Sequence, residues 1–430
     1  MKWSRGTFSL VALLALCATL ILPAAVSAQA QFVLVNLDAG TGLGLDDPTA
    51  VAPVGGNPGT TLGQQRLNVF QRAFDIWGLQ LNSVVPIRVQ ATFTPLNCGP
   101  TFAVLGSAGA LTVNRDFAGA PFASTWFHAA LANSIAGVDL DAGASDEIRA
   151  RFNRSIDFNN NCLNNTNWYY GLDGNPPGSD IDFLTVVLHE LGHGLGFQSF
   201  VDEATGTLLA GFDDIWNWFL GDATLLKLWV NMTNAERVFS AINTGNLVWT
   251  GPNVTAQTGS LTGGVGPFGF VLMYAPNPLE PGSSVSHFDT SLTPNELMEP
   301  SFTNLTTDIG LAFELFQDIS WSMTPAGYSL YSPVPGSAGN TNLFTSAGGT
   351  AGQDTFLIFG LAGGVTPIPG CPGVNSAIAA PQLLTFGPSD PQGIFNFSLP
   401  IGAGAAGLTV LFEAVELSSC QVSNLVTQTF

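Results

Sequence analysis

The chain has 430 residues, with 31 acidic and 11 basic side chains and a formal net charge of −20 at pH 7. This excess of negative charge excludes electrostatic binding to nucleic acid or to anionic lipid. Charged residues make up only 10% of the composition while Asn, Thr, Ser and Gly are abundant, which is typical of the neutral polar surface of an extracellular protein. The acidic residues leave calcium binding open, although no calcium loop of about twelve residues is present.

The first thirty residues have the pattern of a secretory signal peptide. Lys2 and Arg5 form a basic start, residues 10–22 an apolar core, and Ala28 or Ala30 the end of a small-residue cleavage sequence. No later segment has about eighteen uninterrupted apolar residues, the length that spans a bilayer. We therefore expect a secreted protein, extracellular or periplasmic, with no membrane association after signal removal.

Four cysteines remain once the signal peptide is removed: Cys98, Cys162, Cys371 and Cys420. An even number in an oxidising compartment predicts two disulfides, for which three pairings are possible. The positions divide two and two between the halves of the chain, which favours Cys98–Cys162 and Cys371–Cys420. None has C-x-x-C spacing, so metal ligation by cysteine is the weaker alternative.

In chain order, the first half of the sequence predicts a strand, a long helix, a strand and a second helix. Residues 32–36 form an apolar run, and residues 61–81 place apolar side chains at helical spacing after Thr60 or Thr61. Residues 86–93 alternate in polarity and predict a strand, whereas the pattern of residues 103–111 is less clear. The S-x-x-D sequence from Ser179 to Asp182 predicts a capping box at the start of the second helix.

The second half is less periodic until the composition changes near residue 325. Residues 215–228 and 234–243 predict helices, and residues 309–319 predict a short closing helix. Beyond 325 the chain is rich in Gly, Ser, Pro and Thr, and its apolar runs predict a small antiparallel β-sandwich. These runs lie at residues 355–359, 383–386, 394–399 and 408–415.

Residues 189–196 read His-Glu-Leu-Gly-His-Gly-Leu-Gly and contain an HExxH motif. Two histidines four residues apart lie one turn from each other on one helix face, so both can bind one metal ion. Glu190 then points to the neighbouring flank, where it can hold a metal-bound water, as in zinc peptidases. The motif also occurs by chance in ordinary buried helices, but here its polar side chains would lack partners unless a metal satisfied them. We predict zinc on His189 and His193, with Glu190 as general base.

Zinc in a peptidase usually takes three protein ligands and leaves one position for water. The common metzincin position for the third histidine, three residues beyond the glycine, is Ser199, which cannot serve. We favour His287, which lies in a Ser-His-Phe-Asp sequence. The alternative is Glu296, although the prolines at 294 and 300 argue against the helix that such a ligand requires.

These motifs together resemble the leishmanolysin-type metzincins and their bacterial secreted relatives. The resemblance rests on the sequence 189–197, a long insertion, Ser-His-Phe-Asp and then Glu-Leu-Met-Glu-Pro at 296–300. In that family an insertion displaces the third histidine, and a methionine turn lies beneath the zinc. The resemblance covers residues 31–323 and implies that His287 is the third ligand and Met298 the Met-turn methionine. The chain departs from eukaryotic members in having few cysteines and no obvious pro-region, which leaves latency open.

These patterns and the resemblance together predict a domain organisation within an α+β fold. The signal peptide covers residues 1–30, and a metzincin-like catalytic domain with a mixed sheet and an active-site helix covers residues 31–324. An inserted helical and loop subdomain occupies about 200–286, and the antiparallel β-sandwich covers residues 325–430.

The function expected from these motifs is that of a secreted zinc endopeptidase acting on proteins or peptides. The alternatives are a secreted binding protein or adhesin with a silent metal site, and a zinc hydrolase of a non-peptide substrate. The partner of the C-terminal domain and the cleavage preference are left open. We expect structural or solvated roles for the remaining candidate polar residues, although a tyrosine could also serve as an oxyanion donor: His128, Tyr169, Tyr170, Tyr274, Asp202 and Glu203.

Overall fold

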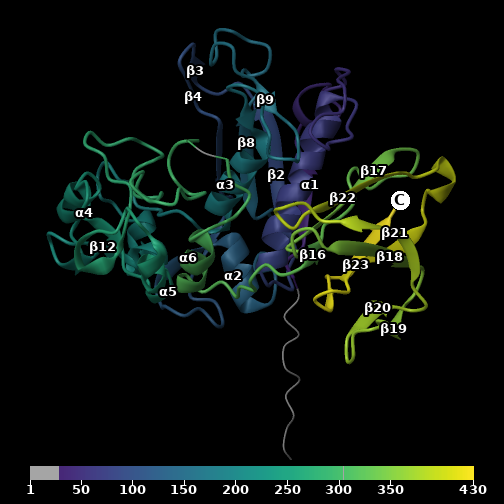
Figure 1. Cartoon of the computed structure of the whole chain (residues 1–430). Helices are drawn as coiled ribbons and strands as arrows, with labels where there is room; N and C mark the ends of the chain where they lie inside the picture. Colours follow the sequence, from purple (N-terminus) through teal and green to yellow (C-terminus); the bar gives the residue numbers. More distant parts are fainter. Residues whose placement is uncertain (1–28, 304) are drawn as a thin grey trace, which may run out of the picture.

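The structure, a computed structural model, describes residues 29–303 and 305–430. The predicted signal peptide therefore lies outside the described residues, apart from Gln29 and Ala30. Helices and strands are mixed along the chain, and the C-terminal sheets are antiparallel, which confirms the α+β class (Figure 1). None of the helices in the described ranges combines the length and the apolar character that a membrane span needs.

A four-stranded mixed sheet forms the base of the larger, N-terminal part of the molecule. Three strands run parallel, β1 (Phe32–Asn36), β2 (Ile87–Thr94) and β8 (Ile148–Asn153), and β5 (Gly106–Ala110) pairs antiparallel with β8 at the edge. Buried residues recur at every second position of β2, as expected for a strand with one face on the core. The predicted strands at 32–36 and 86–93 are confirmed.

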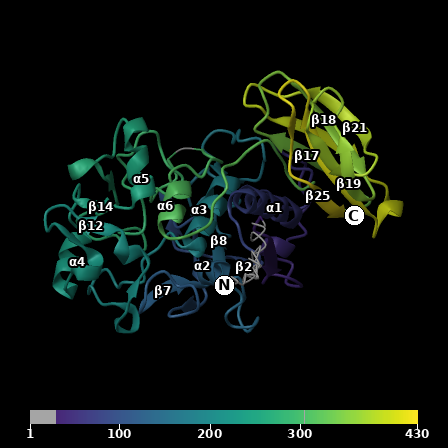
Figure 2. The same cartoon turned by 90° about the horizontal axis from the view of Figure 1, so that it is seen from below.

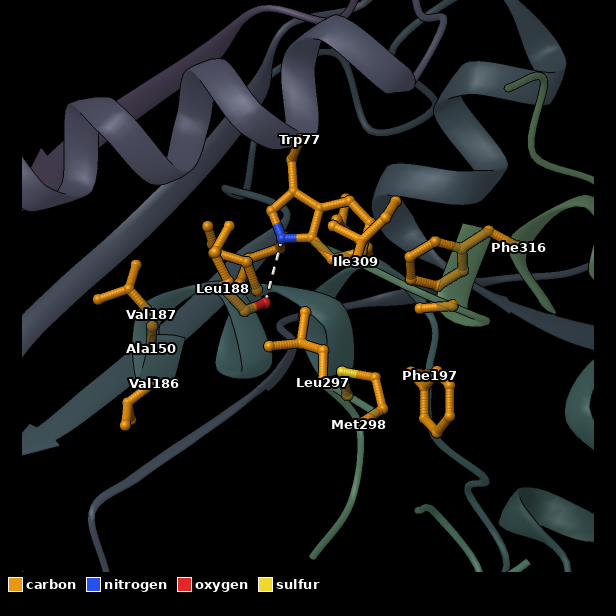
Figure 3. Close-up of a cluster of buried hydrophobic side chains, with 14 of the residues drawn as sticks. Trp77, Ala150, Val186, Val187, Leu188, Phe197, Leu297, Met298, Ile309 and Phe316 are labelled. Carbon is orange, nitrogen blue, oxygen red and sulfur yellow. Dashed lines mark hydrogen bonds between the residues drawn. The ribbon is translucent and has the colours of Figure 1, made fainter. Parts of the chain in front are cut away.

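The predicted long helix is also confirmed as α1 (Leu62–Gln80), which packs against both this sheet and the second helix. The Thr61 side chain accepts a hydrogen bond from the N–H of Gln64 and so caps the helix start. Trp77 is fully buried, and its Nε1–H donates to the carbonyl oxygen of Leu188 at 3.1 Å (Figure 3). This bond ties α1 to the middle of the helix that carries the histidine motif.

That second helix is α3 (Phe183–Leu195), and every residue in it except His189 is buried. Its N-cap is Asp182, whose carboxylate accepts hydrogen bonds from the N–H and the hydroxyl of Thr185, both at 2.8 Å. The predicted capping box from Ser179 is wrong, because the Ser179 hydroxyl binds the preceding loop instead. A methyl group on Gly194 would lie 2.4 Å from Ile148 Cγ2, so only glycine permits this close approach of α3 to β8.

The segment between α3 and His287 differs from the expected helical subdomain. The predicted helix over residues 215–228 is wrong, because Asp222 accepts the N–H groups of Thr224 and Leu225 and turns the chain back on itself. A four-stranded antiparallel sheet results, with the order β13 (Lys227–Leu228), β12 (Leu220–Asp222), β14 (Leu247–Trp249) and β15 (Val271–Leu272). The predicted helix over residues 234–243 is shorter than expected, as α4 (Asn234–Ser240).

The remaining elements of the larger part are short. The helices are α2 (Ala129–Ala136), α5 (Pro252–Gln257) and α6 (Ala312–Asp318), of which α6 is the predicted closing helix. The strands are β3 (Cys98–Gly99), β4 (Phe102–Ala103), β6 (Val113–Asn114), β7 (Thr125–His128), β9 (Trp168–Tyr169), β10 (Ile181–Asp182) and β11 (Asp213–Asp214).

The C-terminal part consists of antiparallel sheets, as predicted. One has the order β16 (Ser329–Leu330), β17 (Thr341–Ala347), β22 (Phe395–Pro400). The other has the order β21 (Gln382–Pro388), β18 (Asp354–Gly360), β23 (Thr409–Glu416), β24 (Gln421–Val422), with β25 (Val426–Thr429) also on β23. A separate hairpin pairs β19 (Gly363–Pro367) with β20 (Asn375–Ile378). The ring centroids of Phe344 in β17 and Phe412 in β23 lie 5.0 Å apart, so the two sheets share a core.

Both predicted disulfides are present, Cys98–Cys162 and Cys371–Cys420. The first joins the β3–β4 hairpin to the loop that precedes β9. The second joins the turn between β19 and β20 to the turn between β23 and β24. Each bond therefore lies within one half of the chain.

The C-terminal sheets lie beside α1, on the side away from the insertion (Figures 1 and 2). Arg72 of α1 is buried, donates to Thr345 Oγ1 at 3.0 Å and lies over the ring of Tyr331. Asp75, one turn along, accepts the N–H of Ser332 at 2.9 Å. α1 thus lies between the C-terminal sheets and α3.

Candidate metal centre

Three histidines converge through their Nε2 atoms at α3. Their Nε2 atoms lie 3.1 Å apart for His189 and His193, 3.1 Å for His193 and His287, and 3.2 Å for His189 and His287. The first two come from successive turns of α3, and His287 comes from the loop after β15. Among the described residues, these three histidines form the group of His, Cys, Asp or Glu side chains that could hold a metal ion.

The opposite ring nitrogen of each histidine is held by a backbone carbonyl. The Nδ1 atoms of His189, His193 and His287 lie 2.8, 2.8 and 2.7 Å from the carbonyl oxygens of residues 297, 197 and 283. A carbonyl oxygen only accepts, so each Nδ1 carries the hydrogen and each Nε2 of the neutral ring presents a lone pair to the centre. Burial lowers the pKa of all three imidazoles, that of His193 to about 3, which favours these neutral rings.

Three acceptor nitrogens facing one another cannot satisfy each other by hydrogen bonds, and a metal ion bound between them could satisfy all three. In a tetrahedral site with Zn–N bonds of about 2.0–2.1 Å, two ligand nitrogens are about 3.3 Å apart. The observed separations of 3.1–3.2 Å fit such a site closely. A buried group of three histidines can therefore hold a metal ion, and the three predicted ligands are the residues that would bind it.

Glu190 lies next to this group but is not part of it. Its side chain is buried, and its carboxylate accepts a hydrogen bond from the N–H of Ala108 in β5. Burial raises the pKa of the Glu190 carboxyl to about 8, and the Ala108 N–H opposes this effect. A nearby metal cation would also favour the ionised carboxylate. Glu190 therefore lies where a proton acceptor beside the metal would be needed.

β5 approaches Glu190 so closely at Gly106 that a larger residue there would displace the Glu190 side chain. A methyl group on Gly106 would lie 2.7 Å from Oε1 and 2.9 Å from Cγ of Glu190. The backbone of Gly106 does not have a positive φ, so alanine is compatible with the strand itself. Gly106 therefore leaves the space that the Glu190 carboxylate occupies, a role that the sequence alone did not reveal.

Gly106→Ala is expected to lower the kcat of any reaction in which Glu190 takes part about 10- to 100-fold, because a shift of about 1 Å in a reacting group has effects of this size. The fold should be retained, since only the end of a flexible side chain has to move. The matched control is Gly109→Ala in the same strand, where an added methyl meets only the Gln198 amide oxygen, at 3.2 Å. Equal activity of the two variants, measured at equal metal content, would contradict this role for Gly106.

Met298, the residue that the resemblance implied for the Met-turn, packs against α3 at Gly192, one residue before His193. It is fully buried, and its backbone oxygen accepts the N–H of Phe288 at 2.9 Å, next to the third histidine. A methyl group on Gly192 of α3 would lie 2.6 Å from the Met298 sulfur. Figure 3 shows Met298 beside Leu297, close to α3 and Phe197. The thioether is therefore packed directly against the glycine between the two helical histidines.

Gly192→Ala is expected to destabilise the protein by about 1–3 kcal/mol, because it overpacks this contact. Met298→Leu should lower stability by less than about 1.5 kcal/mol and leave the metal content unchanged, because the residue acts through packing. Urea unfolding, with metal analysis of the folded fraction, measures both effects. Loss of metal from Met298→Leu without loss of stability would contradict a packing role.

A cavity of about 730 Å³ opens over the histidines and Glu190. Its walls come from β5 with the residues before it, from α3, and from the segment around Met298. Glu296, the alternative third ligand, also lines the cavity, but its carboxylate accepts the N–H of Leu311 at 2.8 Å and it does not belong to the histidine group. Glu299 accepts the N–H of Glu296 at 2.9 Å. Glu299 thus binds the backbone just before Met298, and Glu296 binds the backbone at the start of α6.

The other polar residues considered from sequence lie away from the histidines. His128 is buried against Phe200, with ring centroids 4.3 Å apart, and its nitrogens have no hydrogen-bond partner among the described residues. Three tyrosine hydroxyls donate to carboxylates outside the cavity wall: Tyr169 to Asp173, Tyr170 to Asp157 and Tyr274 to Glu280. The Asp202 carboxylate accepts the N–H of Ala204 within a turn. Glu203 lines the cavity, although the sequence predicted a solvated loop acid at this position.

Comparison with known proteins gives one match. A family model described as SPBPB7E8-like matches residues 148–247, well under half of the chain. The matched segment begins at β8 and includes His189, Glu190 and His193, but ends before His287. No curated protein and no solved structure matches the chain.

Proposed function

We propose that this chain is a zinc metallohydrolase, and more specifically a secreted endopeptidase of the leishmanolysin type within the metzincins. The observation that carries the proposal is the convergence of three imidazole nitrogens at 3.1–3.2 Å beside a buried glutamate. The spacing of the motifs and the methionine packed against α3 support the metzincin assignment. The predicted leader and the two disulfides support secretion, because such bonds persist in oxidising compartments.

Zinc is the metal that suits this donor set, because three neutral imidazoles with one open position are typical of catalytic zinc sites. When bound, zinc would polarise the scissile carbonyl and lower the pKa of a water molecule to about 7. His189, His193 and His287 would hold it through Nε2, with their orientation fixed by the backbone carbonyls at Nδ1.

Glu190 would act as the general base and then as the acid. Its carboxylate would take the proton from the attacking water and deliver it to the leaving amine nitrogen. The Ala108 N–H and the space left by Gly106 fix the position of this carboxylate. General acid–base catalysis requires such fixed placement, within hydrogen-bond reach of the proton that moves.

A peptide substrate is favoured by the edge of the sheet. β5 ends the four-stranded sheet, and its residues 106–108 line the cavity above the histidines. An extended peptide can pair with such an edge through its backbone and so lie across the site. A cavity of about 730 Å³ has room for substrate side chains next to the reacting carbonyl.

The test is cleavage of casein by the purified, zinc-loaded protein, with and without a chelator. We expect the chelator to abolish cleavage. Stoichiometric zinc should restore cleavage, whereas calcium added in place of zinc should not. Metal analysis of the active fraction should give about one zinc per chain. Cleavage that survives complete metal removal would contradict the proposal, as would an inactive protein that is fully loaded with zinc.

A further inference from the structure

Glu203 is the acid of the cavity wall that the mechanism above does not use. The cavity extends along α3, from Thr185 near the start of the helix to His193 near its end. At a rise of about 1.5 Å per residue, these two positions are about 12 Å apart. Gln198 and Glu203, which follow the end of the helix in the chain, also line the cavity wall.

The loop that carries Glu203 is held firmly by backbone bonds. The Asp202 carbonyl oxygen accepts the N–H of Gly206 at 2.7 Å, and the Asp202 N–H donates to Thr207 O at 3.0 Å. Arg237 of α4, itself buried, donates to the carbonyl oxygen of Gly206 at 2.8 Å. Glu203 therefore projects from a turn that is closed at its base and anchored to α4.

The Glu203 side chain is half-buried and has no hydrogen bond or ion pair within residues 29–303 and 305–430. The other two glutamates near the methionine turn differ in this respect, because each accepts a backbone N–H. No lysine or arginine occurs among the described residues that line the cavity. Burial, with Asp202 adjacent, raises the pKa of Glu203 to about 7, as expected for a partly desolvated carboxyl that lacks a cation.

A half-buried carboxylate in a cavity wall whose described residues include no lysine or arginine is complementary to a positively charged side chain of a substrate. We propose that Glu203 is a specificity-determining residue that selects substrates with a lysine or arginine side chain at one position near the scissile bond. The inference rests on the proposed function, since it concerns the same cavity. Glu203 would pair with the substrate cation and take no part in bond cleavage.

The test compares quenched fluorescent peptides that are identical except for arginine or citrulline at one position, which is moved along the peptide. Citrulline keeps the shape of arginine but has no charge. We expect wild-type kcat/KM to favour arginine over citrulline roughly tenfold at one position, as for a charge-assisted hydrogen bond. Glu203→Gln should remove this preference by losing activity on the arginine peptide alone, and Glu203→Lys should favour a glutamate peptide.

Asp354→Asn is the matched control, since it removes the same charge at an exposed position in β18, outside the cavity wall. It should leave the arginine preference unchanged. A wild type with no arginine preference at any position would overturn the inference, and so would an equal preference in Glu203→Gln. Melting temperatures of the variants establish that they fold.

A binding measurement separates this inference from the proposed function. The arginine and citrulline peptides, made with a reduced and therefore uncleavable bond, are titrated into the protein with and without zinc. Tighter arginine binding that is lost in Glu203→Gln, in a protein that cleaves nothing, would support the role of Glu203 and overturn the peptidase proposal. Cleavage without any preference for arginine over citrulline, in binding or in turnover, would support the peptidase proposal and overturn the role of Glu203.

Discussion

Glu190→Ala is expected to lower kcat on a peptide substrate about 10²- to 10⁴-fold, the usual contribution of a general acid–base residue, and to leave bound zinc in place. Glu190 supplies none of the three converging nitrogens, so its removal should not weaken metal binding. Turnover needs a proton acceptor beside the attacking water, and the proposed mechanism assigns this role to Glu190, which lies next to the histidine group.

Glu190→Gln is the stricter version of this experiment, because glutamine keeps the shape that fits under Gly106. Burial disfavours the charged form of Glu190 in the metal-free protein, so the neutral amide should not lower the melting temperature. Zinc content, kcat and melting temperature of both variants are measured on the same preparations. Substantial activity in Glu190→Gln would rule out the glutamate as the base.

His287→Ala is expected to lose the metal and all activity. Two histidines on α3 would remain, and the loss of one of three ligands should weaken zinc binding by more than the 10- to 100-fold typical of changes around a ligand. The metal also binds only the folded protein, so it raises the melting temperature of the wild type. A chelator should therefore lower the melting temperature of the wild type but not that of His287→Ala.

The matched control for this variant is His128→Leu, which alters the one histidine of the sequence outside the metal group. His128 is buried against Phe200 and contributes no nitrogen to the metal group, so zinc content should be unchanged even if stability falls. Zinc affinity and activity equal to wild type in His287→Ala would exclude His287 as the third ligand. Glu296 would then have to be tested in the same way.

The parts of the site that depend on local periodicity could be predicted from the sequence. Histidines four residues apart share a helix face in any α-helix, so the relation of His189 to His193 needed no tertiary information. The strand at 32–36, the helix at 61–81 and the alternating strand at 86–93 were predictable for the same reason. The disulfides followed from the count and the positions of the cysteines.

Features that depend on tertiary contact could not be predicted. His287 lies 94 residues beyond His193, so no local periodicity relates the two; it was favoured as one of the few remaining histidines and by the family resemblance, and its role as a ligand stays a prediction. Gly106 and Glu203 have no sequence signal, because their meaning depends on which side chain the fold brings opposite them. The helix predicted over residues 215–228 was wrong because apolar spacing could not reveal the turn that Asp222 makes.

The Cys98–Cys162 bond has a consequence for where an active enzyme could exist. It fastens the β3–β4 hairpin to the loop that contributes Leu163 and Thr166 to the cavity wall. The bond would be rare in a reducing cytosol and stable only after export to an oxidising compartment. For a protease with this architecture, export would then also be the step that completes the substrate cleft.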